Sequence, residues 1–244
     1  MGSSSGQDEQ CIPHLQQNLF VVCYAVKYSS NVKKSIIVAF LLALIFTSCK
    51  EPTTIDNKLI IFDSFAKTFE REIPLSRNGR PDIFYTFTKT NQLQLRLDSL
   101  ENGFDGLQIR IWYDAAYINK QKVVIISYSK AHWTASVYNM VPILESKEKY
   151  QFSKKTNNVT PKSGWTYFSN ELLNLQILTL PNGNDDQNCG AGGGDGSTYN
   201  VEIATKKHYR YYGYWEPEEY RDKCQQAKNM SDILRLLKNE LGIE

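Results

Sequence analysis

Acid–base chemistry in this chain would depend on very few histidines. Beyond residue 48 there are two, His132 and His208, and either could serve as the base that a serine hydrolase needs. This part of the sequence has no G-x-S-x-G, H-E-x-x-H or C-x-x-C motif that would place a nucleophile or a zinc ion beside them. Carboxylate pairs such as Glu101 with Asp105 or Asp114 could act as in glycosidases, but a chain with 26 acidic residues always offers such pairs. We therefore predict no catalytic residue and keep a hydrolase as the alternative.

The glycine-rich segment GAGGGDG, residues 190–196, would cradle a phosphate only if it opened a helix. No G-x-G-x-x-G register fits it, no Lys-Ser or Lys-Thr follows, and the next residues predict a strand. Oxygen ligands for calcium are also present nearby, but their spacing matches no EF-hand loop; they are Asp185, Asp186, Asn188 and Asp195. We therefore expect a solvated surface loop, with no bound metal and no cofactor.

The densest mixture of aromatic and basic side chains is KKHYRYYGYWEPEEY, residues 206–220. Alternate side chains of a strand point to opposite faces, so one face would pack on a sheet while the other would meet solvent. Tyr, Trp and Arg dominate the hot spots of protein interfaces, and aromatic rings also stack on sugars. The alternative is a cross-strand aromatic ladder that only stabilises a hairpin. We predict here a binding face for a protein or glycan partner, made of Tyr209, Arg210, Tyr211, Tyr212, Tyr214 and Trp215.

An apolar run, Ile36–Phe46, follows a pair of lysines and is itself followed by TSC, which ends at Cys49. Its length suits the core of a signal peptide and is too short for a membrane-spanning helix, which needs about 20 residues. Small residues before a cysteine resemble the lipobox of bacterial lipoproteins, in which that cysteine is lipidated and becomes the first residue of the mature chain. The resemblance implies that acylated Cys49 inserts into a lipid bilayer. It also implies a place in the bacterial cell envelope, either periplasmic or surface-exposed.

The apolar run begins late for a signal peptide, at residue 36. Val32 precedes two lysines, and a bacterial GTG start codon reads internally as valine, so translation from that codon would give an ordinary lipoprotein start. A genuine N-terminal extension, or an added tag at MGSSSG, is the alternative. We assign residues 1–48 to an upstream segment and signal peptide, 49–57 to a polar tether, and 58–244 to a single domain.

Two cysteines remain for the folded domain, Cys189 and Cys224. An isolated pair in a protein bound for an oxidising compartment can form a disulfide, here between the glycine-rich loop and the C-terminal helix. Two unpaired thiols are the other reading, because free cysteine is among the most buried residue types. The sequence leaves both readings open.

Alternation of apolar and polar side chains predicts several strands, over residues 82–90, 93–100, 107–116, 123–129 and 133–141. Short connections indicate an antiparallel meander, and residues 198–215 indicate a hairpin that turns near Lys206-Lys207. Residues 58–73 fit either a strand or a short helix, and residues 144–164 fit a polar loop. Helical periodicity over 165–180 and from Pro217 to Leu241 completes the pattern. The predicted fold class is α+β, an antiparallel sheet with two or three packed helices.

The net charge of +2 gives no strong attraction for nucleic acid, and we expect no nucleic-acid partner. The lipobox, the strand meander, the strand opened by GDGS and the helix start WEPEE resemble uncharacterised envelope lipoproteins of Bacteroidota. This resemblance implies a location and a fold but no known activity. The segment SGWTY, residues 163–167, is similar to the S-G-x-x-Y motif of bacterial lysozyme inhibitors. We expect a membrane-anchored, non-catalytic binding protein, of inhibitor or immunity type in one version. A hydrolase of an envelope polymer is the alternative.

Overall fold

The computed structural model describes residues 63, 68–76, 78–113, 121–146, 149–190 and 196–243, with all of their side chains except those of 141–153. The chain divides into two units, Met1–Pro52 and Thr53–Glu244, and every described residue belongs to the second unit. The predicted upstream segment, signal peptide, lipidation site Cys49 and tether therefore lie outside the described residues.

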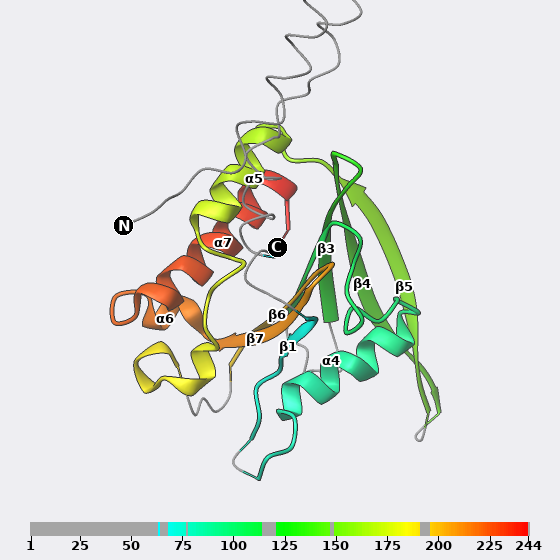
Figure 1. Cartoon of the computed structure of the whole chain (residues 1–244). Helices are drawn as coiled ribbons and strands as arrows, with labels where there is room; N and C mark the ends of the chain where they lie inside the picture. The colour runs from blue at the N-terminus through cyan, green and yellow to red at the C-terminus, as the bar shows by residue number, and fades with distance from the viewer. Residues whose placement is uncertain are drawn as a thin grey trace, which may run out of the picture. The chain divides into compact units, whose positions relative to one another are not determined.

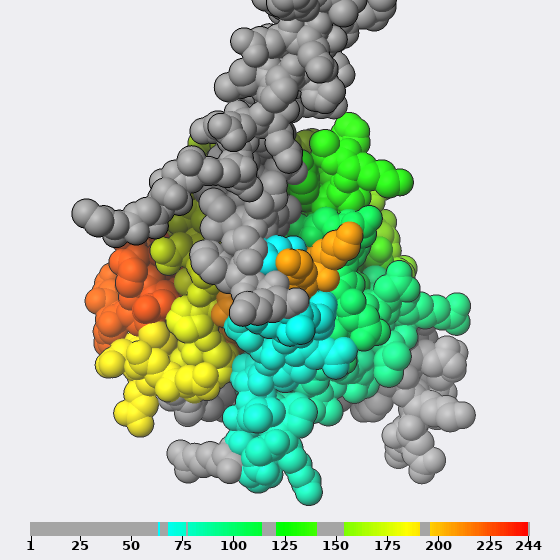
Figure 2. Space-filling model, viewed as in Figure 1, coloured from blue at the N-terminus to red at the C-terminus, as the bar shows by residue number. Residues whose placement is uncertain are grey.

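A seven-stranded sheet of spatial order β1-β7-β6-β2-β3-β4-β5 forms the centre of the described fold. Its strands are β1 (Glu70–Glu72), β2 (Leu107–Tyr113), β3 (Gln121–Ser129), β4 (His132–Ser146), β5 (Lys149–Val159), β6 (Thr198–Thr205) and β7 (His208–Trp215). Strands β2 to β5 form the predicted antiparallel meander, and the predicted β6–β7 hairpin joins it where β6 pairs with β2. Among the described strands only β1 pairs in parallel, with β7, and Figure 2 shows its cyan segment next to the orange hairpin.

Four α-helices occur in the described part of the chain: α4 (Ile83–Gln94), α5 (Trp165–Asn174), α6 (Pro217–Tyr220) and α7 (Gln225–Leu241). Helices α5 and α7 lie beside each other on one side of the sheet (Figure 1), and α4 covers the other side. Pro217 opens α6 as the sequence predicts, and Gly242 ends α7 in the left-handed conformation, with a φ of 68°. The predicted α+β fold class is confirmed.

The main core lies between the sheet and the helices α5 and α7. Alternate side chains of the strands point into it and meet one face of each helix; the fully buried members include Leu107, Ile109, Ile111, Val201, Ile203, Phe168, Leu172, Ile233 and Leu237. Burying one such side chain stabilises a fold by about 1.5–3 kcal/mol. This core therefore holds α5 and α7 against the sheet.

The opposite face of the sheet is polar at its centre, where Glu202 of β6 is fully buried. The Nζ of Lys89, on α4, lies 2.6 Å from Glu202 Oε1 and 3.2 Å from Glu101 Oε1. The indole N–H of Trp112 donates to Glu202 Oε2 at 2.8 Å, and the Tyr209 hydroxyl donates to Oε1 at 2.9 Å. A buried carboxylate is tolerated only when it is paired and hydrogen-bonded, and both oxygens of Glu202 meet that requirement.

This network reverses the usual amphipathic pattern of α4. The helix buries Tyr85, Thr88, Asn91 and Gln92, while its large apolar side chains face outward, Ile83 being 60 % and Leu93 74 % exposed. Thr88 forms a 3.1 Å hydrogen bond with Tyr211 of β7, which adds a second polar contact beneath the helix. Polar side chains therefore dock α4 on the sheet, and apolar ones remain on its outer surface.

The predicted strand over 82–90 is wrong, because this segment is α4. The Asp82 carboxylate accepts the Phe84 N–H at 2.7 Å and caps the helix, as aspartate commonly does. The predicted strand over 93–100 is also wrong: it holds the end of α4 and a turn in which Arg96 has a φ of 52°. Hydrophobic periodicity failed here because the inner face of α4 is polar.

The predicted loop over 144–164 is wrong in its first part, which contains the end of β4 and all of β5. β5 is an edge strand, and its side chains from 154 to 158 are exposed, so it lacks the apolar alternation of a strand with one buried face. Lys154 Nζ donates to the Leu95 carbonyl at 3.0 Å. Lysines on an edge strand also discourage pairing with other chains.

The pairing of Lys89 with Glu202 generates a stability prediction. The substitution Lys89→Met leaves a buried carboxylate without its counter-charge, so we expect the free energy of unfolding to fall by about 3 kcal/mol in urea titrations. Adding Glu202→Gln to Lys89→Met should restore part of that loss, because the unpaired charge is then removed. The control Lys155→Met, on the exposed surface of β5, should change stability by less than about 0.5 kcal/mol. An equal effect of the two lysine substitutions would contradict the role of Glu202.

Candidate functional site

The predicted binding face on β7 is not a surface. Tyr209, Tyr211, Tyr212 and Tyr214 are all buried, with at most 4 % of any of them exposed. β7 lies between β1 and β6, and both of its faces are covered, so neither set of alternating side chains meets solvent. Their placement corresponds to the structural alternative, in which these aromatic residues stabilise the hairpin.

The hydroxyl groups of these tyrosines are used inside the protein. On the α7 side of the sheet, Tyr212 donates to the Ile177 carbonyl at 2.7 Å and Tyr214 donates to the Pro181 carbonyl at 2.8 Å. The other two predicted residues are half-buried: Arg210 donates to the carbonyl of Leu180 at 3.2 Å and pairs with Glu72, and Trp215 packs near Tyr220. None of the six side chains therefore offers the exposed face that was predicted.

The two candidate histidines lie far apart in the fold and in different surroundings. His132 is exposed next to the tight β3–β4 turn, where Lys130 and Ala131 both have positive φ. His208 is buried, with Nδ1 2.8 Å from Asp63 Oδ1 and Nε2 3.3 Å from Glu70 Oε2. Carboxylates occupy both ring nitrogens of His208, which leaves neither free to take a proton from a nucleophile.

The candidate carboxylates do not form an open acid–base pair either. Glu101 accepts a 2.6 Å hydrogen bond from the Tyr85 hydroxyl and pairs with Lys89, whereas Asp105 is exposed. Burial alone would raise the pKa of Glu101, but the Tyr85 hydrogen bond and the Lys89 charge bring it below its usual value. Asp114 lies outside the described residues. Glu101 thus acts as a partner of α4 and remains ionised.

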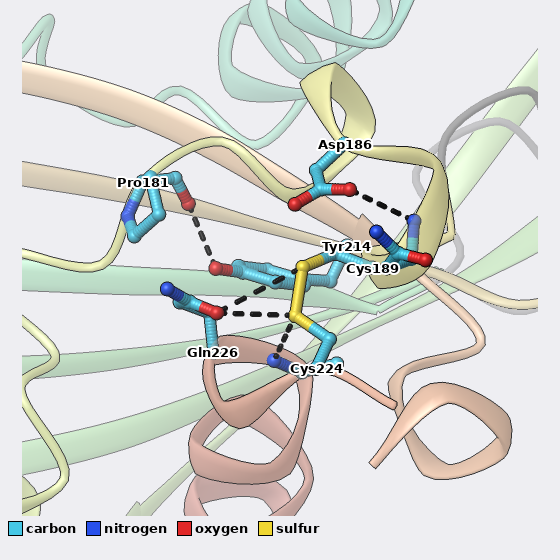
Figure 3. Close-up of a disulfide and its surroundings, with 8 residues drawn as sticks. Pro181, Asp186, Cys189, Tyr214, Cys224 and Gln226 are labelled. Atoms are coloured by element: carbon cyan, nitrogen blue, oxygen red, sulfur yellow. Dashed lines mark hydrogen bonds between the residues drawn. A yellow bond between two sulfur atoms is a disulfide. The ribbon is translucent and has the colours of Figure 1, made fainter. Parts of the chain in front are cut away.

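Cys189 and Cys224 form a disulfide, with their Cα atoms 5.2 Å apart (Figure 3). The bond joins the 3₁₀ turn Gln187–Cys189 to the start of α7, where the Ala227 N–H donates to Cys224 Sγ at 3.3 Å and caps the helix. Gln226 Oε1 lies 3.2 Å from Cys224 Sγ. Of the two readings that the sequence leaves open, the structure has the bonded one.

Only the ends of the glycine-rich segment, Gly190 and Gly196, are described. Gly190 ends the 3₁₀ turn in the left-handed conformation, with a φ of 104°, and no helix begins at Gly196, which precedes β6. Asp186 uses its carboxylate within the turn, accepting the Asn188 N–H at 2.8 Å. Within the described ranges no group of three His, Cys, Asp or Glu side chains could hold a metal ion.

The SGWTY segment opens α5 and is largely tied into the fold. Ser163 donates from both its hydroxyl and its N–H to Glu240 Oε2, each at 2.8 Å. Trp165 stacks on Trp133 with ring centroids 6.1 Å apart. Ser163, Thr166 and Tyr167 are exposed, and Tyr167, at 53 %, is the large side chain of this segment that a partner could reach.

A pocket of about 330 Å³ lies where β2 ends and β6 begins, between these strands and the helices α6 and α7. Its apolar and aromatic walls come from Tyr113, Tyr199, Pro217, Leu234 and Ile243, and its polar walls from Glu216, Glu218, Ser231, Arg235 and Lys238. The volume falls at the lower end of the range for small-ligand sites, about 300–1,000 Å³. We call this site the α6–α7 pocket, and it is the candidate functional site.

The acidic side chains of the α6–α7 pocket are already engaged. The Glu216 carboxylate accepts the Ser197 N–H, and Glu218 accepts from the Ser231 hydroxyl and, at 2.8 Å, from Arg221. The hydrogen bond from Ser231 and that from Arg221 lower the pKa of Glu218, so it stays ionised. Of the two basic residues, Arg235 contacts Asp232. The ammonium group of Lys238 has no hydrogen-bond or ion-pair partner among the described residues.

Tyr113 also lines the pocket. Its ring meets that of Tyr199 edge-on, at 5.3 Å between centroids, and the Nζ of Lys122 lies 5.5 Å from its centroid. The hydroxyl is buried and makes no hydrogen bond within the described part of the chain. Burial and, next, the neighbouring Tyr199 raise the pKa of Tyr113, which keeps the group protonated. The hydroxyl is thus closed to the pocket, and the exposed Lys238 ammonium is a pocket group without a partner among the described residues.

The sequence alone offered no signal for the α6–α7 pocket, because its residues come from four helices and strands and from positions just outside α6 and α7. No protein-family model matches the chain, no curated protein matches its sequence, and no solved structure matches its fold. None of the helices in the described ranges has the length and the hydrophobicity that crossing a bilayer requires.

The disulfide generates a second stability prediction. It closes a loop with a sequence separation of 35 residues, so the substitution Cys189→Ser should lower the free energy of unfolding by about 4 kcal/mol. Cys189 is the residue to change, because Cys224 also caps α7. Reducing agent should destabilise the unmodified protein and leave the Cys189→Ser variant unaffected. Alkylation of Cys189 and Cys224 themselves in the unreduced, denatured protein would contradict the bond.

Proposed function

We propose that this chain is a lipoprotein of the bacterial cell envelope, held to a membrane by lipid on Cys49, that binds a ligand without transforming it. The observation that carries the proposal is the Cys189–Cys224 disulfide. Disulfides form and persist in oxidising compartments such as the periplasm and are rare in the cytosol. The lipobox-like residues that follow the Ile36–Phe46 run also indicate an exported chain.

Binding is the activity that the geometry favours. The α6–α7 pocket has apolar and aromatic walls and a few polar groups at its edge, among them Lys238, and this is the composition of a ligand site. A protein that the chain neutralises, such as a secreted toxin or lysozyme, is one version of the ligand. Such a protein would insert a chain end or a side chain in the pocket. The exposed Tyr167 would supply a second contact.

The alternative, a hydrolase of an envelope polymer, has no comparable support among the described residues. A base must face the proton that it removes, and His208 has carboxylates at both nitrogens while His132 is exposed beside a turn. Neither histidine lines the α6–α7 pocket, and its carboxylates accept hydrogen bonds from the chain itself.

Lipidation of Cys49 is tested by the intact mass of the protein extracted from membranes of a producing bacterium. We expect a mature chain that begins at Cys49 and carries the added mass of its acyl groups. The substitution Cys49→Ala should abolish both the added mass and the cleavage, whereas the matched control Cys23→Ala should change neither. A chain that retains residues 1–48 with an unmodified Cys49 would overturn the proposal.

A further inference from the structure

We propose that the outer side of α4 lies on an anionic lipid bilayer, at the boundary between head groups and acyl chains. The exposed positions on this side of the helix are called the α4 outer face: Ile83, Thr86, Phe87, Thr90, Leu93 and Gln94. This placement deepens the proposed function and rests on it for the membrane anchor. The face itself follows from the way in which α4 packs and does not depend on lipidation at Cys49.

Large apolar side chains that reach solvent gather on this helix and next to it. Of the six that the described chain exposes, three belong to the α4 outer face, with 60 % of Ile83, 38 % of Phe87 and 74 % of Leu93 exposed. A fourth, Leu75, lies opposite Pro81 in an isolated β-bridge just before the helix. Single exposed apolar residues need no explanation, but a group of them marks an interaction surface.

Helical geometry arranges the α4 outer face as one uncharged stripe. With 3.6 residues per turn, its six members fall within an arc of about 120°, and none of them carries a charge. The opposite arc holds the buried polar residues Thr88, Asn91 and Gln92. Lys89 lies between the two arcs, and its ammonium group turns inward to Glu202. An apolar stripe of this width is what a helix in a membrane interface presents to the acyl chains.

Basic side chains stand at both ends of the stripe. Arg80 and Arg96 are exposed just before and just after α4, and neither side chain has a hydrogen-bond or ion-pair partner among the described residues. The nearest carboxylates in the sequence are Asp82, which caps the helix, and Asp98, which is exposed beyond Arg96. Each cation that meets an anionic bilayer strengthens binding about fivefold. The stripe and its two arginines therefore complement anionic head groups and acyl chains together.

A second copy of the chain fits this face less well. In an antiparallel packing of α4 on its own copy, Arg80 of one protomer would lie beside Arg96 of the other, since these residues stand at opposite ends of the helix. In a parallel packing each arginine would meet its own counterpart. Like charges would face each other in both cases. An anionic bilayer has no such conflict, so it is the occupant that the charges favour.

The proposed anchor has the reach to bring α4 to the membrane. Fourteen positions separate Cys49 from Asp63, the first described residue, and an extended chain of that length spans up to about 50 Å. A small domain is only about 30 Å across, so the anchor permits either side of the domain to face the bilayer. Attachment also raises the local concentration of the face to the millimolar range, at which a few apolar side chains suffice for contact.

Photolabelling from within the bilayer tests the contact. The chain is isolated from membranes of a producing bacterium and placed in vesicles of phosphatidylcholine and phosphatidylglycerol in equal amounts, with a diazirine on the acyl chains. We expect label on the peptides that contain Ile83, Phe87 and Leu93, and only background on residues 154–158 of the exposed strand β5. Equal labelling of the two segments would overturn the inference. Cross-links between two α4 helices in place of lipid label would also overturn it.

A charged residue on the face provides a matched comparison. Ile83→Asp should reduce the label at Phe87 and Leu93 about fivefold, because a carboxylate is excluded from the acyl region and repelled by anionic head groups. The variant should keep its melting temperature, since the first turn of a helix favours an acidic side chain. The control Lys228→Asp, at an exposed position of α7 on the other side of the sheet, should leave the label unchanged. Undiminished label in Ile83→Asp would contradict a membrane-facing helix.

Vesicles of phosphatidylcholine alone, which have no net charge, test the choice of an anionic surface. The label on α4 should be about fivefold lower there, because Arg80 and Arg96 lose their counter-charges. Equal label on both kinds of vesicle would overturn that choice.

The mass at Cys49 separates this inference from the proposed function. Acylated Cys49 without label on α4 would refute the membrane-facing helix and leave the anchoring in place. Unmodified Cys49 with label on α4 would refute the lipidation and support the helix on the bilayer.

Discussion

A carboxylate buried at the centre of the sheet, Glu202, is the constraint on which one side of this fold depends. A charge with no exposure needs a counter-charge and hydrogen-bond donors, which Lys89, Trp112 and Tyr209 supply. Lys89 comes from α4, so the helix must turn its polar side chains inward. Its apolar side chains, Leu93 above all, are consequently left on the outside. The other side of the sheet follows the ordinary rule, and its apolar core with α5 and α7 leaves the α6–α7 pocket at one end.

The difference between the two sides explains how much of the fold could be predicted. The meander and the hairpin were found because β2, β3 and β6 alternate or run apolar against a hydrophobic core. The helix α4 was missed because periodicity assumes that apolar side chains point inward, and Ile83 and Leu93 do not. The prediction of an exposed aromatic face on β7 was wrong for a related reason. The short strand β1 and the carbonyls of Ile177 and Pro181 cover that strand, and no local pattern reveals such distant partners.

The candidate site illustrates the same limit. The residues that line the pocket are often single positions on separate elements, such as Tyr113 on β2 and Tyr199 on β6. No sequence motif links them to Lys238 on α7. The cysteine pair could be named from the sequence, which left open whether the two residues are bonded. What the sequence did supply without the fold is the apolar run before Cys49, which lies outside the described residues. The proposed location therefore joins one sequence pattern to one structural feature, the disulfide, and the two share no residue.

One peptide map tests both the processing at Cys49 and the Cys189–Cys224 disulfide. The protein is isolated from its native membranes and alkylated without reduction before digestion. An exported lipoprotein should give an N-terminal peptide that begins at acylated Cys49 and a linked pair of peptides that contain Cys189 and Cys224. Peptides from residues 1–48 together with alkylated Cys189 and Cys224 would mean a chain that was neither processed nor oxidised. That result would contradict the envelope location and, with it, the proposed function.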